Sequence, residues 1–212
     1  MVTNQGSIFS ALFKLKFQEG QIRFCSNRPA KTDVGLEMNE NTSVKLIAAI
    51  LYRSEKEYEQ LLPLLKDTYS AVDYQGNFFP FVETDYYEME MGKGLVRGMI
   101  SFEQLVHPGC LAEVKHQSRD LEDQFSIDSN RRVNIDIGYM DMFKVVLASF
   151  KGRSNKIYLS DDVWADMILY YESGAYKSFM WGFPDFKSGI YDADLMEIRS
   201  IYKKQLKLQR KQ

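Results

Sequence analysis

The segment RRVNIDIGYMD at residues 131–141 carries side chains that could bind an anion. Apolar and polar residues alternate along it, as in a strand with one buried face and one polar face. The polar series consists of Arg131, Arg132, Asn134 and Asp136, and Tyr139 could stack on a ligand. Arginine binds carboxylates and phosphates through paired hydrogen bonds, and Gly138 precedes an expected helix N-terminus, which favours anions. Alternatively, Asp136 pairs with Arg97 on the expected strand 95–105, which we place as its neighbour in the sheet.

A second candidate is the acidic loop FVETDYYEMEMGKG, which begins at Phe81. Its carboxylates could bind magnesium or act as acids and bases, and its tyrosines could stack on a ligand. The residues concerned are Glu83, Asp85, Tyr86, Tyr87, Glu88 and Glu90. Alternatively, the loop is a solvated acidic turn whose tyrosines pack on the sheet.

The third candidate is the aromatic stretch MWGFPDFKSGIY at residues 180–191. Trp181 could stack on a planar ligand, with Asp185 beside it as a hydrogen-bonding group. Alternatively, the stretch covers an open face or edge of the sheet.

Several familiar chemistries are missing from the sequence. MGKGLVRG has glycines and a lysine at the wrong spacing for a phosphate-binding loop, and no guanine-reading motif is complete. His107 and His116 are nine residues apart and would face opposite ways on a helix, so they form no local metal pair. We expect His107 to cap a helix and His116 to be a surface residue.

Composition places the chain among folded globular proteins. It has 212 residues, of which 45% are hydrophobic and 14% aromatic. Residues 44–192 carry 16 basic and 23 acidic side chains, a net charge of −7, which argues against a nucleic-acid-binding body. Two distant cysteines and no apolar run long enough to span a membrane predict a cytoplasmic protein with free thiols.

The elements predict an α+β fold. The order over residues 44–139 is strand, helix, strand, strand, helix, strand, which is that of a ferredoxin-like split β-α-β core with an antiparallel sheet and both helices on one face. The first helix has capping-box spacing at Ser54 and Glu57 and a kink or split at Pro63. After the core we expect a helix over 140–149, then a β-meander and a final helix. The elements are the strands 44–52, 77–82, 95–105, 131–139, 156–160, 163–171 and 176–181, and the final helix begins near Asp192.

Residues 1–43 differ from the rest of the chain. Residues 26–43 are polar with little periodicity, so we expect residues 1–43 to be a poorly ordered extension and linker before a single domain at 44–212. Met38 could be a natural start.

Five motifs in series resemble the bacterial family called domain of unknown function 4416, over about residues 44–202. They are FPFVETDYYEMEMG, SFEQLVHPGCLAEVK, RRVNIDIGYMDMFKVVLAS, KIYLSDDVWADMILYY and WGFPDF. The chain departs from the family pattern at Ile137, where proline is expected, and at His107, where an acidic cap is expected. The resemblance implies no activity. Some members carry a GTP-binding label, which the motifs of this chain do not support. Positions that match the family pattern are Asp85, Tyr86, Tyr87, Gly92, Arg131, Arg132, Asn134, Asp136, Gly138, Tyr139, Trp181, Pro184 and Asp185.

The leading hypothesis is a domain that binds a small anionic ligand, phosphorylated or not. Arg131 or Arg132 would hold the anion, while Asp85 and Asp136 would orient hydroxyl groups or a metal ion. One alternative is a protein-interaction module, which predicts arginines engaged in ion pairs and an exposed apolar patch. Another is a metal-assisted hydrolase at the Glu83–Glu90 loop.

Overall fold

A computed structural model describes residues 42–82, 84–153 and 155–211, and the side chain of Asp85 lies outside the described part. The predictions for residues 1–41, including a start at Met38, therefore fall outside it. In chain order the elements are β1 (Val44–Tyr52), α2 (Glu55–Thr68), β2 (Val72–Pro80), η1 (Asp85–Tyr87), α3 (Glu88–Met91), β3 (Val96–Val106), η2 (Pro108–Cys110), α4 (Leu111–Gln124), β4 (Val133–Met140), β5 (Lys144–Ser149), β6 (Ile157–Ser160), β7 (Val163–Glu172), β8 (Ala175–Ser178), α5 (Pro184–Lys187) and α6 (Asp192–Gln209).

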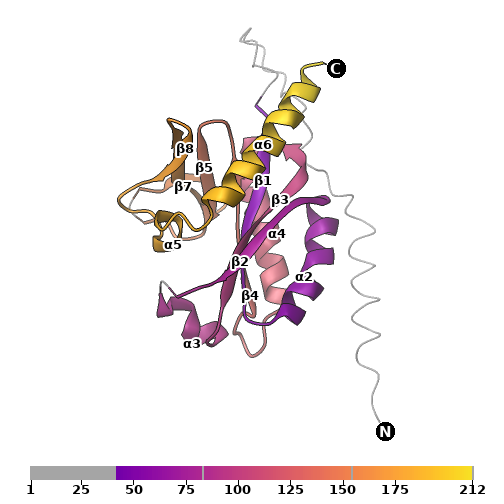
Figure 1. The fold of residues 1–212 in the computed structure, drawn as a ribbon. Helices are drawn as coiled ribbons and strands as arrows, with labels where there is room; N and C mark the ends of the chain where they lie inside the picture. The colour runs from indigo at the N-terminus through magenta and orange to yellow at the C-terminus, as the bar shows by residue number, and fades with distance from the viewer. Residues whose placement is uncertain (1–41, 83, 154, 212) are drawn as a thin grey trace. The chain divides into compact units, whose positions relative to one another are not determined.

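The strands form one antiparallel sheet of eight strands in the order β2-β3-β1-β4-β5-β7-β6, with β8 also paired to β7. Figure 1 shows α2 and α4 side by side on one face of this sheet and α6 crossing the other. The predicted α+β class and antiparallel sheet are confirmed. We call the face under α2 and α4 the helix face and the opposite one the second face.

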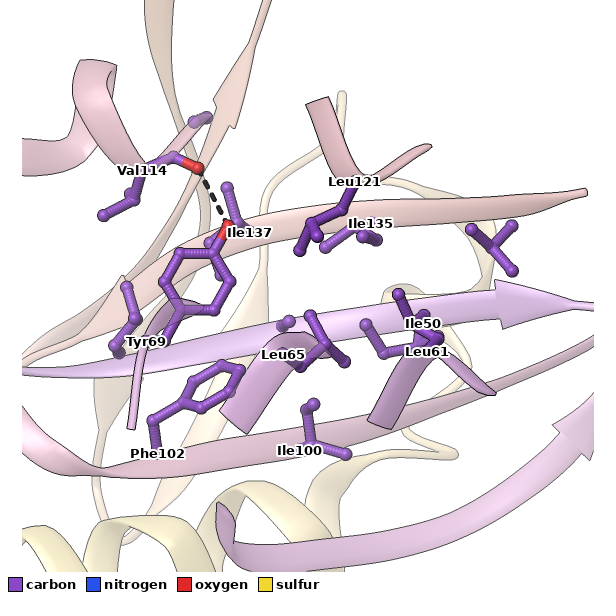
Figure 2. Close-up of a cluster of buried hydrophobic side chains, with 14 of the residues drawn as sticks. Ile50, Leu61, Leu65, Tyr69, Ile100, Phe102, Val114, Leu121, Ile135 and Ile137 are labelled. Carbon is purple, nitrogen blue, oxygen red and sulfur yellow. Dashed lines mark hydrogen bonds between the residues drawn. The ribbon is translucent and has the colours of Figure 1, made fainter. Parts of the chain in front are cut away.

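The helix face holds the larger core. Alternate residues of the central strands, such as Ile50 of β1 and Ile135 of β4, pack against Leu61 and Leu65 of α2 and Leu121 of α4 (Figure 2). The side-chain period of a strand sends every second residue to this face, and the helical period sends every third or fourth residue toward it. Both helices therefore lie on one face, as expected from the order of the elements.

The second face has its own core, formed largely with α6. Leu195 and Ile198 of α6 pack with Ile47 and Ala49 of β1 and with Met99 of β3. Because β1 contributes to both cores, all nine of its residues are buried, which explains its apolar sequence.

Local sequence signals set the start of α2. The carboxylate of Glu57 accepts a hydrogen bond from the backbone N–H of Ser54 at 3.0 Å, and the predicted capping box is present. The helix continues through Pro63, so the alternative of a split there is wrong.

The helix predicted over 140–149 is wrong, because residues 144–149 form strand β5. Val146 and Ala148 pack in the helix-face core, whereas Val145 and Leu147 pack in the core of the second face. A short run that is apolar on both faces suits a central strand, and helical periodicity cannot be distinguished over so few residues. Consequently Gly138 lies within β4 and precedes no helix N-terminus.

Other predicted boundaries also need correction. The second strand begins at Val72 instead of residue 77, although it does lie at a sheet edge. The three strands expected as a meander are present, but β5 pairs along one side of β7, so β6 and β8 share its other side. The turns 161–162 and 173–174 have positive φ at both residues, which suits two-residue hairpin turns.

A Tyr69→Phe variant is expected to lose about 1 kcal/mol of unfolding free energy. The Tyr69 hydroxyl donates to the carbonyl oxygen of Val114 at 3.1 Å inside the helix-face core (Figure 2), and burial raises its pKa. Urea unfolding measures the loss. As a control, Tyr158→Phe alters an exposed hydroxyl and should leave stability unchanged. Equal stability of wild type and Tyr69→Phe would contradict a stabilising role for the hydrogen bond between Tyr69 and Val114.

Candidate functional site

The polar residues of β4 lie on the second face, beside the central strand. Leu51 of β1 is paired with Arg97 of β3 on one side and with Asn134 of β4 on the other. Asp136 lies two residues further along the same face of β4, opposite Ala49. The prediction that the strands of Arg97 and Asp136 are neighbours is wrong, because β1 separates them.

Arg97 nevertheless reaches Asp136 across β1. Its side chain is buried, and it donates from Nη2 to Asp136 Oδ2 at 2.5 Å and from Nη1 to Asp185 Oδ2 at 2.8 Å. The guanidinium also lies over the rings of Phe81 and Phe186, at 5.5 and 5.4 Å. Burial alone would lower the pKa of Arg97, but the two carboxylates more than offset this, and the pKa is raised. The predicted alternative of an ion pair is therefore confirmed for Asp136.

Arg131 is held by a different carboxylate. It donates from Nε to Glu90 Oε1 at 2.7 Å and from Nη2 to Glu90 Oε2 at 2.8 Å, a two-pronged contact. Its Nη1 donates to Asn134 Oδ1 at 2.8 Å and lies 3.5 Å from Glu122. The hydrogen bond from Arg131 is the main cause that lowers the pKa of Glu90. The acidic loop thus supplies the counter-charge of Arg131, which lies just before β4.

Sequence reasoning missed the contribution of α4. Glu122 is buried and accepts from the backbone N–H of Ile135 at 2.6 Å, while buried Lys115 donates to the Ile135 carbonyl at 3.1 Å. Burial is the main cause that raises the pKa of Glu122. The sequence does contain a signal for this contribution. Lys115, Ser118 and Glu122 recur with the helical spacing of the buried face of α4, which places them against the sheet.

The two tyrosines of η1 differ in environment. Tyr87 is half-buried, lies edge-on to Phe81 with ring centroids 6.0 Å apart, and has its pKa raised by burial and then by Asp136. Tyr86 is 59% exposed and accepts a hydrogen bond from Lys151, which lowers its pKa. Tyr87 therefore borders the polar side chains on the second face, whereas Tyr86 faces solvent.

Three predicted residues make their contacts elsewhere. Arg132 donates from Nε to Glu57 Oε1 of α2 at 2.8 Å. Tyr139 packs against the helix-face core, on the opposite side of β4 from Asn134. Trp181 stacks on Phe179 with ring centroids 4.9 Å apart. The placement of the Asp85 side chain remains a prediction.

The residues that do come together define what we call the second-face site: Tyr87, Arg97, Arg131, Asn134, Asp136 and Asp185. Two buried donors in it, Arg97 Nε and Asn134 Nδ2, have no hydrogen-bond partner among the described residues. The side chain of Asp136 is 24% exposed, which connects the site to solvent. Buried donors without acceptors cost free energy, so the arrangement suits a molecule that offers acceptor oxygens.

The described residues hold neither a cluster suited to a metal ion nor a membrane-spanning helix. In that part of the chain, no three or more His, Cys, Asp or Glu side chains are grouped so that they could hold a metal ion. His107 caps η2 by accepting from the Gly109 N–H at 3.1 Å, and His116 is exposed, both as predicted. Within the same residues, no helix has the length and apolarity needed to cross a bilayer.

A Glu90→Gln variant is expected to lose about 1–2 kcal/mol of unfolding free energy at pH 7. Because the folded state lowers the pKa of Glu90 from its ordinary value of 4.5, this stabilisation is present above about pH 4.5 and disappears as pH falls through the folded pKa. Urea unfolding of both proteins across this pH range measures the difference. Glu88→Gln is the matched control in α3, since Glu88 makes no ion pair with any described residue. A difference that stays constant with pH would contradict the role of the carboxylate.

Comparison with known proteins gives one positive result. No curated protein and no solved structure matches the chain significantly. A family model does match, and it covers residues 42–202, which include every residue of the second-face site and the whole span expected from the motifs. The chain therefore belongs to the family described as "Domain of unknown function (DUF4416)".

Proposed function

We propose that this domain binds a small polar ligand at the second-face site. The supporting observation is the pair of buried donors, Arg97 Nε and Asn134 Nδ2, which flank Leu51 and have no acceptor among the described residues. Native proteins rarely leave such groups unsatisfied, so acceptor oxygens of a ligand are a natural complement. The partly exposed Asp136 would accept a ligand hydroxyl, and the Tyr87 ring would border the ligand.

The charges around the site bear on whether the ligand is anionic, as the sequence predicts, or neutral. Arg97 and Arg131 face the three carboxylates of Glu90, Asp136 and Asp185, while Glu122, which also lies near Arg131, is shared with Arg119. An anion would therefore have to replace a carboxylate at Arg97, and Asp136 is the exposed one of its two partners. A neutral polyhydroxylated ligand needs no such exchange, so it is the form that the electrostatics favour.

Thermal-shift measurements with matched pairs test this proposal. Each pair contains a neutral compound and its phosphorylated counterpart, such as a hexose with a hexose phosphate and a nucleoside with a nucleoside monophosphate. Binding to the folded state must raise the melting temperature by mass action. We expect a neutral member to raise it in wild type, and Asn134→Ala to weaken that affinity by up to about ten-fold.

The control is Asn77→Ala, which removes an exposed amide of β2 and should leave the affinity unchanged. If only phosphorylated members bind, the ligand displaces Asp136, and Asp136→Asn should then strengthen binding. A panel without any shift, or equal shifts in wild type and Asn134→Ala, would overturn the proposal.

A protein-interaction module is the second candidate, favoured by the edge strand β6. All four residues of β6 are exposed, and three are the apolar Ile157, Tyr158 and Leu159. The opposite edge, β2, carries Pro80 and two register irregularities, whereas β6 has one irregularity, between Tyr158 and Ser160. An exposed apolar edge can pair with a strand of another chain, and a second copy of this chain could supply β6 in antiparallel pairing.

Light scattering tests this second candidate. We expect wild type to dimerise at high concentration and Leu159→Lys to remain monomeric, since the added charge must be desolvated on pairing. A monomeric wild type would contradict self-association through β6.

The topology of the core and the cellular location of the protein are also proposals. We infer a ferredoxin-like core from β1–β4 with α2 and α4, supported by the order β2-β3-β1-β4 and antiparallel pairing throughout. A cytoplasmic bacterial setting and a metal-assisted hydrolase at the loop around Glu83 and Asp85 stay predictions.

A further inference from the structure

A separate cavity of about 470 Å³ lies at the other end of the sheet. The start of β1, the β4–β5 turn and the C-terminal half of α6 form its walls, which include Tyr139, Phe143, Lys144, Leu206 and Arg210. Its volume falls within the range of small-molecule sites, roughly 300–1,000 Å³. None of the residues of the second-face site lines it.

The apolar wall is exposed and yet firmly positioned. The Phe143 side chain is 73% exposed, but its N–H donates to Asp141 Oδ1 at 2.7 Å and its carbonyl accepts from the Tyr171 N–H at 2.7 Å. Its backbone is therefore fixed on both sides while the ring remains in water. A large apolar group presented in this way loses little entropy on contact with an apolar ligand.

One cation that lines the cavity has no ion-pair partner among the described residues. Lys144 forms an ion pair with Asp141, so their charges cancel. The Arg210 side chain is exposed and makes no hydrogen bond or ion pair with any described residue. The Tyr202 hydroxyl is already used, because it donates to the Ser43 carbonyl at 2.6 Å. The cavity thus combines apolar walls with one net positive charge.

We propose that this cavity binds an amphipathic anion, a molecule with an apolar body and one carboxylate, sulfonate or phosphate group. The apolar body packs against Phe143 and Leu206, and the anionic group meets the guanidinium of Arg210. Guanidinium suits such groups because its planar donors match two oxygens at once. The site is independent of the proposed ligand of the second face, because the two share no residue.

The test compares two fluorescent probes on the full chain: anilinonaphthalene sulfonate and its uncharged counterpart, phenylnaphthylamine. Wild type should bind both probes. Arg210→Gln should weaken the sulfonate by about three- to five-fold, as expected for an exposed ion pair, and leave the uncharged probe unchanged. Phe143→Ser should weaken both probes.

Two further variants locate the binding. Lys211→Gln removes a neighbouring exposed cation outside the cavity and should affect neither probe. Trp181→Ser reports on the exposed aromatic stretch and should also have no effect. Thermal melting checks that each variant is folded. The proposal is overturned if wild type binds neither probe, if Arg210→Gln binds the sulfonate as well as wild type, or if Trp181→Ser abolishes binding that Phe143→Ser leaves intact.

Discussion

An Arg97→Met variant is expected to unfold with a free energy about 3–5 kcal/mol lower than that of wild type. Arg97 is 4% exposed and is the only described cation in an ion pair with Asp136 or Asp185. Removing it leaves the carboxylate of Asp185, itself buried, without a counter-charge. Since domains are stable by only about 5–15 kcal/mol, urea unfolding should reveal the loss clearly.

Two comparisons separate the charge effect from other causes. Arg153→Met changes an exposed arginine and should alter stability by less than about 0.5 kcal/mol. A triple variant, Arg97→Met with Asp136→Leu and Asp185→Leu, should recover much of the loss, because apolar groups of similar size can replace a buried ion cluster. A loss that is equally large in the triple variant would mean that packing at residue 97, and not charge, is responsible.

A Gly138→Ala variant is expected to lose about 3 kcal/mol or more, the upper end of overpacking effects. A Cβ atom at residue 138 would lie 2.1 Å from the Val146 carbonyl oxygen and 2.9 Å from Leu147 Cα, both on β5. Backbone atoms cannot move aside without breaking strand pairing, and Gly138 is paired directly with Leu147. Thermal and urea unfolding both measure the effect.

Gly174→Ala provides the matched comparison. Gly174 has φ of +88°, but a Cβ atom there would meet nothing within 4 Å. Only the backbone conformation then opposes the substitution, which costs about 1–2 kcal/mol. A smaller loss for Gly138→Ala than for Gly174→Ala would show that β5 can shift away from β4.

The parts of the fold that depend on local pattern were predictable. Alternation in residues 133–137 placed Asn134 and Asp136 on the face opposite the apolar residues, and the capping box at Ser54 marked the start of α2. The error over 140–149 has a physical origin, since Val145–Ala148 is apolar at every position and a period of two cannot be seen in it. Its assignment as a strand depends on burial from both faces, which only the assembled sheet provides.

The composition of the candidate site and the pairing of Asp136 with Arg97 were predictable, but the other pairings were not. Arg131, Asn134 and Asp136 were found from sequence, yet the carboxylates that pair with Arg131 and with Arg97 at α5 are far away along the chain. Glu90 precedes Arg131 by 41 residues, and Asp185 follows Arg97 by 88. Sequence spacing carries no information about such contacts, because loops of very different length differ little in closure free energy. Arg132, adjacent to Arg131, contacts α2 on the opposite face, because successive side chains of an extended segment point to opposite sides.

The ion pair between Arg97 and Asp185 links the second-face site to α5, and α5 follows directly on the exposed Trp181 and Phe183. A ligand that drew Arg97 away from Asp185 would loosen the attachment of this short helix. By thermodynamic reciprocity, any partner that fixed the aromatic stretch in its present position would oppose such a ligand by the same factor. Ligand binding at the second-face site and partner binding at the aromatic stretch would therefore be coupled through one buried contact, and occupancy at either place would change the affinity at the other.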